Sequence, residues 1–172
     1  MWPLDRPVVR PLRPGEANKC ERILRELSEW FGIPSAIDEY RRSLDHLDTY
    51  VAVIDGRVAG FLALKPLTPT SAEIHVMAVD RKHHRQGIGR ALVEAAERWA
   101  LERSFEYLTV KTVGPSREDP DYHKTRQFYL AVGFAPLEET NLWGEANPCL
   151  IMVKHLRCRG EQTWASSGEP RV

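Results

Sequence analysis

Apolar residues recur along the chain with two different spacings. Positions three and four apart, as on one face of a helix, predict helices within residues 20–31, 37–47 and 87–103. Short apolar runs bounded by turn residues predict strands at residues 8–12, 50–54, 58–64, 72–79, 105–112, 134–138 and 148–156. A fourth helix is expected from Pro120 to Val132, with Asp119 as its cap and Gly133 at its exit. The order βααβββαβαββ predicts an α+β domain.

Turn residues support these boundaries. Asp55-Gly56 between two apolar runs is a strong hairpin signal. The second helix follows Pro34, and we interpret Ser35 with Asp38 as its capping pair. Residues 1–156 are therefore expected to form a single domain. Residues 157–172 are polar and contain Gly and Ser, so we expect a flexible tail.

Composition narrows the class of protein. The 172 residues are 42% hydrophobic and 28% charged, as is typical of a globular protein. Because 24 basic residues balance 24 acidic ones, a broad nucleic-acid surface is not expected. Residues 1–10 lack the apolar core of a signal peptide, and no run is long enough to span a bilayer. Cys20, Cys149 and Cys158 have no metal-ligand spacing, and their odd number argues against a disulfide framework, so we expect a cytoplasmic protein without metal.

A glycine-containing turn follows the strand at residues 72–79. Gly87 and Gly89 would let the backbone approach a ligand at a helix start, where free N–H groups favour anions, and Arg85 and Arg90 could add charge. The turn thus fits a pyrophosphate, although an ordinary strand-to-helix turn would look the same. A dinucleotide fingerprint would need Gly or Ala at Leu92, and no Gly-Lys-Ser/Thr motif is present.

Two segments together resemble the GNAT superfamily of N-acetyltransferases. Arg85-Gln86-Gly87-Ile88-Gly89-Arg90-Ala91-Leu92 is similar to its acetyl-CoA motif, and Phe128-Tyr129-Leu130-Ala131-Val132-Gly133-Phe134 is similar to its late helix. The element order matches over residues 8–156. The resemblance implies a mixed, mostly antiparallel sheet flanked by helices and splayed between the strands at 72–79 and 105–112. Because a helix connects these two strands, they should be parallel.

The resemblance also implies acetyl-CoA as the co-substrate. Its contacts would come from Met77, Ala78, Val79, Arg85, Gln86, Gly87, Ile88, Gly89, Arg90, Tyr122 and Tyr129. Most pyrophosphate contacts would be backbone N–H groups, and those of Met77 and Val79 would hold the pantetheine arm and the acyl carbonyl. Two positions depart from the family pattern. His84 stands where Gln or Arg is usual, and Tyr122 stands where many members carry Asn.

Acetyl transfer to an amine needs a base, since an alkylamine with a pKa of about 10.4 is protonated at neutral pH. Glu73 is the first candidate, because the strand around it resembles the one that carries a Glu base in histone-acetylating members. The alternative is a solvated carboxylate at a strand end. His75 has the same side-chain parity and is the second candidate; the alternative is a hydrogen-bonded strand histidine. Glu138 and Glu139 are more distant options.

Tyr129 is the candidate acid. In the family, a Tyr at this helix position protonates the leaving thiolate, whereas a purely structural Tyr129 would line the cleft or the core. Cys149 is expected to be an inert buried thiol, and His83 and His84 to be surface residues. The aromatic loops at residues 30–34 and 141–144 would pack or shape the acceptor pocket.

The sequence therefore predicts an acetyl-CoA-dependent N-acetyltransferase that acts directly on a primary amine of a small molecule or peptide. Two alternatives stay open: a CoA-sensing module that has lost catalysis, and an acyltransferase with a longer acyl donor. Partners other than acetyl-CoA and the amine are not expected, except that a homodimer is left open. The acceptor itself is not identified by the sequence.

Overall fold

The computed structural model describes residues 7–156, which form seven strands and four α-helices in the predicted order. The elements are β1 (Val8–Pro11), α1 (Ala17–Glu26), α2 (Pro34–Ser43), β2 (Asp48–Ile54), β3 (Arg57–Pro66), β4 (Ser71–Val79), the 3₁₀ turn η1 (Arg81–His83), α3 (Ile88–Glu102), β5 (Tyr107–Val113), α4 (Pro120–Ala131), β6 (Ala135–Thr140) and β7 (Cys149–His155). The expected tail at 157–172, Cys158 and most of the N-terminal segment lie outside the described residues.

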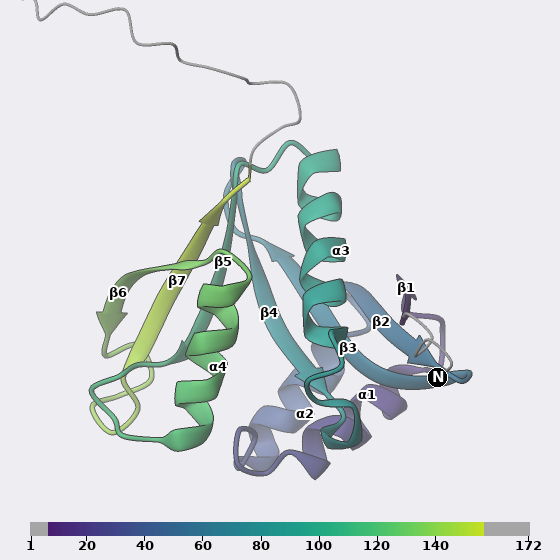
Figure 1. Cartoon of the computed structure of the whole chain (residues 1–172), viewed down its shortest axis with the longest axis horizontal. Helices are drawn as coiled ribbons and strands as arrows, with labels where there is room; N and C mark the ends of the chain where they lie inside the picture. The colour runs from purple at the N-terminus through teal and green to yellow at the C-terminus, as the bar shows by residue number, and fades with distance from the viewer. Residues whose placement is uncertain (1–6, 157–172) are drawn as a thin grey trace, which may run out of the picture.

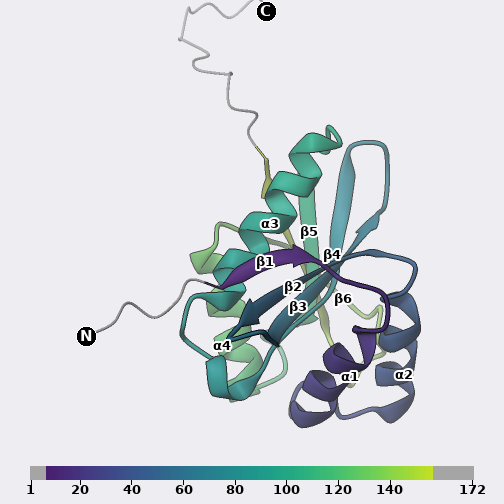
Figure 2. The ribbon, with the colours of Figure 1, turned by 90° about the vertical axis from the view of Figure 1, so that its right-hand side faces the viewer.

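The strands form one sheet in the order β1-β2-β3-β4-β5-β7-β6. Every neighbouring pair is antiparallel except β4 and β5, which are parallel. Helices α3 and α4 cover one face of the sheet, and α1 and α2 cover the other (Figure 2). This arrangement confirms the predicted α+β class and the mixed, mostly antiparallel sheet.

The two parallel strands separate along their length. Pairing between β4 and β5 runs from Ser71 opposite Tyr107 to Ile74 opposite Val110 and stops there, although both strands continue. In Figure 1 the two strands lie side by side at the top and diverge towards the bottom, with α4 in front of the opening. The predicted splay between these strands is therefore confirmed.

A hydrophobic core lies on each side of the sheet. The α3 side contains the predicted stripe of that helix, and Ile88, Leu92, Ala95 and Trp99 are all buried. On the opposite side, α1 and α2 pack on alternate residues of β3 and β4. The sheet is therefore covered on both faces over β2 to β4, and this packing positions the end of β4.

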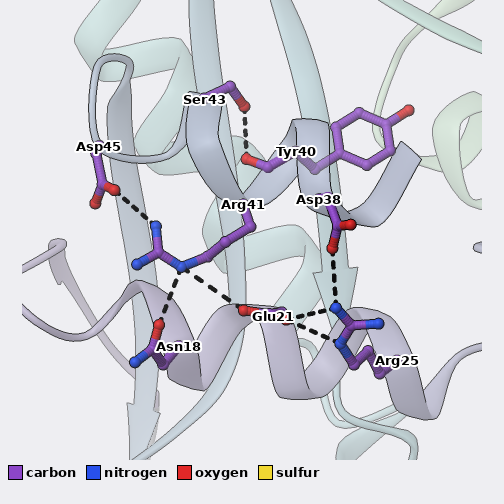
Figure 3. A network of polar contacts seen from close by, with 8 residues as sticks. All are labelled: Asn18, Glu21, Arg25, Asp38, Tyr40, Arg41, Ser43 and Asp45. Atoms are coloured by element: carbon purple, nitrogen blue, oxygen red, sulfur yellow. Dashed lines mark hydrogen bonds and ion pairs between the residues drawn. The ribbon is translucent and has the colours of Figure 1, made fainter. Parts of the chain in front are cut away.

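Ion pairs hold α2 on α1 (Figure 3). Arg41 contacts Asn18, Glu21 and Asp45, and Arg25 contacts Glu21 and Asp38. A hollow between these helices is lined by Glu21, Asp38 and Arg41 of this network and by Ser35 and Arg42, and it is separate from Glu73 and Tyr129. Tyr40 lies on α2 beside this network, and its side chain points away from α1 in Figure 3.

Two details of the first helices differ from expectation. Helix α1 ends at Glu26, so Trp30 and Phe31 lie in the turn that follows rather than on the helix. Helix α2 begins at Pro34, with Ile33 in the cap position and no side-chain cap, so the predicted capping role of Ser35 was wrong. Proline at the first helical position lacks one of the N–H groups that have no partner at a helix start, and its fixed φ suits the helix.

The remaining turns follow their sequence signals. Asp55 and Gly56 both have positive φ, 48° and 73°, as a tight hairpin turn between β2 and β3 requires. Asp119 caps α4 by accepting hydrogen bonds from the N–H groups of Asp121 and Tyr122. Within residues 7–156, no helix combines the length and apolar character needed to cross a bilayer.

Candidate active site

A bulge in β4 brings Glu73 and His75 together. Ala63 on β3 lies opposite Val76, but Leu64 lies opposite Ile74, so His75 is an extra residue on β4. The Nδ1 atom of His75 lies 3.7 Å from a carboxylate oxygen of Glu73, and its ring centroid lies 5.5 Å from that of Tyr40 on α2. The two base candidates therefore share the α2 side of the sheet.

Glu73 is buried and paired, which excludes the alternative of a solvated strand end. Its carboxylate accepts a hydrogen bond from the ammonium group of Lys111 on β5. Burial raises the pKa of Glu73, but the contacts with His75 and Lys111 outweigh burial, so the pKa lies below its ordinary value. The carboxylate is thus held in the ionised form that can accept a proton.

The backbone of β4 beyond the last β5 pair has free donors that face the opening. The N–H group of Asp80 donates to Ala59 of β3 at 2.8 Å. Because N–H groups alternate in direction along a strand, those of Val79 and Met77 point away from β3, toward the side where β5 has separated. The carbonyl of Val79 points the same way and lies 2.7 Å from Nε2 of His84, which must carry the proton because a carbonyl only accepts.

The turn after β4 has the conformation that its glycines predict. Gly87 has φ 80° and Arg85 has φ 63°, and α3 begins directly after Gly87 at Ile88. The first N–H groups of α3 have no partners within the helix and can receive an anion. No hydrogen bond or ion pair joins the exposed Arg85 side chain to another described residue.

Three side chains of this turn contact other parts of the protein. These residues would therefore bind a ligand through their backbone N–H groups. Gln86 donates to the carbonyl of Lys82 at 3.1 Å, which closes the turn. Ile88 is buried in the core. Arg90 reaches the carbonyl of Ala131 at the end of α4, at 3.5 Å.

Packing within the protein favours glycine at position 89. A Cβ atom placed on Gly89 would lie 3.0 Å from the ring of Phe128 on α4. The glycine therefore lets α4 approach the start of α3, in addition to any approach of a ligand. This contact links the two segments that carry the family resemblance.

Tyr129 is the buried residue within α4. Its ring packs edge-on against Phe128 and Phe134, with centroid distances of 5.3 and 5.6 Å. Burial raises the pKa of the phenol, and the hydroxyl group makes no hydrogen bond with the described residues. Tyr129 belongs to the core on the α3 side, whereas Glu73 faces α2. The two candidates lie on opposite sides of the sheet, and groups from both sides can reach one ligand only through the opening between β4 and β5.

Hydrogen bonds hold the turn after α1 against α4. The indole N–H of Trp30 donates to the hydroxyl of Thr125 at 3.1 Å, and the hydroxyl of Tyr122 donates to the carbonyl of Trp30 at 2.9 Å. Arg81 lies over the Trp30 ring at 5.9 Å, and His84 packs against its edge. Tyr122 thus uses its hydroxyl within the protein, and Trp30 connects α4 with the turn after β4.

Other candidates lie elsewhere. Glu138 is exposed on β6, and Glu139 accepts from the N–H of Ser116 at 3.3 Å beside Gly114, so neither is placed with Glu73.

Cys149 is a buried thiol whose pKa is raised by burial, as an inert cysteine should be. His83 is half-buried beside Gln86. Across the described part of the chain, no group of three or more His, Cys, Asp or Glu side chains could hold a metal ion.

The sequence did not reveal the contact of Lys111 with Glu73 or the hydrogen bonds that hold Trp30 against α4. Lys111 is separated from Glu73 by an entire helix and strand start, and only the parallel register of β5 brings its amine to that carboxylate. A signal was present, because the helix between the two strands predicts a parallel pair. The register, however, cannot be read from the sequence.

Comparisons with known proteins agree with this geometry. The family model described as "Acetyltransferase (GNAT) family" matches residues 18–134. A crystal structure of a putative acetyltransferase of the GNAT family from Desulfovibrio desulfuricans superposes with a TM-score of 0.77 at 19% identity, over 88% of this chain and 99% of that one. An aminoglycoside 6'-N-acetyltransferase complexed with coenzyme A gives 0.72 at 17% identity, over 90% and 99%. A GNAT family acetyltransferase from Elizabethkingia anophelis with acetyl-CoA bound gives 0.67 at 20%, over 88% and 99%.

Proposed function

The chain belongs to the acetyltransferase (GNAT) family, and from this premise we propose that it moves an acetyl group from acetyl-CoA directly to a primary amine of a small molecule or peptide. The observation that carries the proposal is the opening between β4 and β5, beside which Glu73 lies ionised and the N–H groups of Met77 and Val79 are free of β3. Acetyl-CoA and the acceptor would meet where the strand pairing stops, each approaching from one side of the sheet.

Binding of acetyl-CoA is supported by the turn and by the separated strand. The pyrophosphate would lie on the N–H groups of residues 85–90, and Arg85 would add positive charge. The pantetheine arm would then follow β4, where Met77 and Val79 offer donors. Similar folds have been solved with coenzyme A or acetyl-CoA bound, which supports the same co-substrate here.

The acceptor amine would approach from the α2 side, where Glu73, His75 and Tyr40 meet. Glu73 would remove the amine proton, directly or through water, so that a neutral nitrogen attacks the acetyl carbonyl. His75 remains the second candidate, because its ring borders the same space. The N–H of Met77 or Val79 would stabilise the negative charge that develops on the acetyl oxygen.

Tyr129 would act from the other side of the sheet. Its raised pKa keeps the phenol protonated, which is the state that a proton donor to a departing thiolate requires. The hydroxyl has no hydrogen-bond acceptor among the described residues, and a ligand in the opening could supply one. A purely structural tyrosine would instead contribute through its ring contacts with Phe128 and Phe134.

Release of CoA thiol tests the proposal. Acetyl-CoA would be mixed with the full chain and a panel of primary amines that includes polyamines, aminoglycosides and peptides. Thiol release that depends on both an amine and the protein is the expected result. Acetyl-CoA binding by calorimetry without thiol release from any amine would favour the CoA-sensing module. Faster turnover with propionyl- or butyryl-CoA would favour the longer acyl donor.

We also propose a cytoplasmic location. The two cysteines within the described residues, Cys20 and Cys149, are unpaired and buried. Free thiols fit a reducing compartment. Fractionation of cells that produce the protein, with acetyl-CoA-binding activity measured in each fraction, would test the location.

A further inference from the structure

Lys111 carries a primary amine at the point where β4 and β5 separate. Val110 is the last residue of β5 that pairs with β4, and Lys111 follows it directly. Its side chain turns back toward β4 and donates to the carboxylate of Glu73. The side chain is 28% exposed, so it lies where the two strands separate rather than enclosed in a core.

This contact places an amine against the group that is proposed to deprotonate the acceptor. Another lysine provides a comparison. Lys154 is similarly exposed, at 22%, and is also ion-paired, but with Glu97 of α3 and with the carbonyl of Val132. Lys124 on α4 is far more exposed, at 73%. Lys111 therefore differs from Lys154 in its carboxylate partner, Glu73, and not in charge or exposed fraction, and it is less exposed than Lys124.

We propose that Lys111 is a self-acetylation site, on which the protein places the acetyl group of its own bound acetyl-CoA when no better acceptor occupies the opening. The proposal rests on the function proposed above, since it uses the same co-substrate and the same base. Only the acceptor differs: it is a side chain of β5 that is already held beside Glu73.

The step balances without a further reactant. Lys111 gives up one ammonium proton to Glu73, and its neutral Nζ attacks the acetyl carbonyl. The new C–N bond forms as the thioester C–S bond breaks. The second proton of the nitrogen is lost on collapse to the amide, and the CoA thiolate leaves as a thiol after taking one proton. The products are acetyl-lysine, CoA and one proton, which Glu73 passes to solvent, with no change of oxidation state.

Acetylation would also change the site itself. The amide formed at Lys111 carries no charge and no longer competes for the Glu73 carboxylate as an ammonium group does. Glu73 would then keep His75 as its remaining polar neighbour on β4. Self-acetylation would thus alter the environment of the proposed base, and the modified and unmodified proteins should differ in their pH–rate profiles.

Peptide mapping by mass spectrometry tests the proposal on the full chain. The protein would be incubated with acetyl-CoA and no amine, and acetylation followed at each lysine over time. We expect Lys111 to be acetylated well before Lys154 and Lys124. If Lys124 leads, or if denatured protein gives the same pattern, the reaction is chemical acetylation by exposure and the proposal is overturned.

Two variants and a series of protein concentrations test whether Lys111 reacts within its own molecule. Glu73→Gln should slow acetylation of Lys111 by about 10²–10⁴-fold, the range for loss of a general base, and leave the slow rate at Lys124 unchanged. Lys111→Arg should abolish fast incorporation without transferring it to another lysine. The rate per molecule should not depend on protein concentration. A rate that rises with protein concentration would mean transfer between copies and would overturn attack within the opening.

Failure of this inference can be distinguished from failure of the proposed function. Calorimetry and amine-dependent thiol release would be measured on the same preparation. Acetyl-CoA binding and turnover with an amine, but no modified Lys111, would reject self-acetylation and leave the acetyltransferase proposal intact. Absence of acetyl-CoA binding would reject both.

Discussion

The ring of Phe128 on α4 fills the space that a side chain on Gly89 of α3 would need, with 3.0 Å between a Cβ atom there and the ring. The start of α3 and the helix that carries Tyr129 are therefore in direct contact. A substitution at Gly89 must disturb this contact as well as any ligand that approaches the turn.

Gly89→Val should weaken acetyl-CoA binding and also lower the free energy of unfolding by about 1–3 kcal/mol, the usual cost of overpacking. Calorimetry and urea unfolding would measure the two effects. Gly89→Ala combined with Phe128→Leu serves as the control, because the smaller side chain makes room for the added methyl group. If the double variant recovers both stability and full affinity, the glycine serves packing alone and the ligand-approach hypothesis is wrong.

Glu73→Gln should lower turnover with an amine by about 10²–10⁴-fold at pH 7, because the amide cannot accept the proton. Affinity for acetyl-CoA should change little, and the loss should shrink at high pH, where the amine deprotonates in solution. Glu139→Gln is the matched control, since Glu139 lies on β6 beside Gly114. A full-rate Glu73→Gln enzyme at pH 7 would transfer the role to His75 or to water.

Lys111→Met should move the low-pH limb of kcat/KM to higher pH. A base works only above its own pKa, and the pKa of Glu73 should rise once the Lys111 contact that opposes burial is gone. The groups that face Glu73 are then His75 and, from α2, Tyr40. Lys111→Arg keeps the positive charge and should leave the limb near its original pH. Superimposable profiles for wild type and Lys111→Met would argue that Glu73 is not the titrating base.

Tyr129→Phe should lower turnover by about 10–10³-fold, somewhat below the general acid–base range, since a thiol with a pKa of about 8.5 is a moderate leaving group. The ring contacts with Phe128 and Phe134 remain, so stability should change little. Tyr122→Phe provides a comparison, because that hydroxyl donates to the carbonyl of Trp30. A Tyr129→Phe rate near wild type would falsify the acid assignment.

Glu16→Gln should destabilise the fold at neutral pH. Glu16 is buried before α1 and accepts hydrogen bonds from Arg10 at 2.7 and 3.0 Å, and these bonds lower its pKa to about 2. Because the folded pKa is depressed, the stabilisation is present above the unfolded value of about 4.3 and is lost as pH falls through about 2. We expect a loss of about 1–3 kcal/mol at pH 7 that diminishes below pH 4.3.

Unfolding of Glu16→Gln would be measured over a pH series beside Glu26→Gln. Glu26 pairs with Arg22 on the surface of α1 and is 45% exposed, so its loss should cost no more than about 0.5 kcal/mol. Equal losses in the two variants at pH 7 would contradict a special contribution from Glu16.

Strand and helix order could be predicted from the sequence because the local signals agreed with the final packing. The Asp55-Gly56 turn, the Asp119 cap and the stripe on α3 each needed only neighbours in the chain. The end of α1 could not be predicted from its neighbours in the chain, because Trp30 is held by hydrogen bonds with Thr125 and Tyr122, which lie on α4. Apolar spacing alone continued that helix too far.

In the candidate site, too, some features could be predicted from the sequence and others depend on how distant strands pack. Glu73 and Tyr129 could be proposed from their positions within segments that resemble a family. Burial of Glu73, the bulge at His75 and the partner on β5 depend on how β3, β4 and β5 align. Alignment between strands follows from the whole sheet, so Lys111 became visible only in the structure.

The interrupted pairing of β4 and β5 gives the sheet two edges in its interior, in addition to its outer strands β1 and β6. A bound pantetheine arm that accepts from the Met77 and Val79 amides would act as an added strand and slow hydrogen exchange at those two positions. Ligand that binds only the folded chain raises its unfolding free energy by RT ln(1 + [L]/Kd). Resistance of the folded chain to proteolysis should then rise with the concentration of acetyl-CoA.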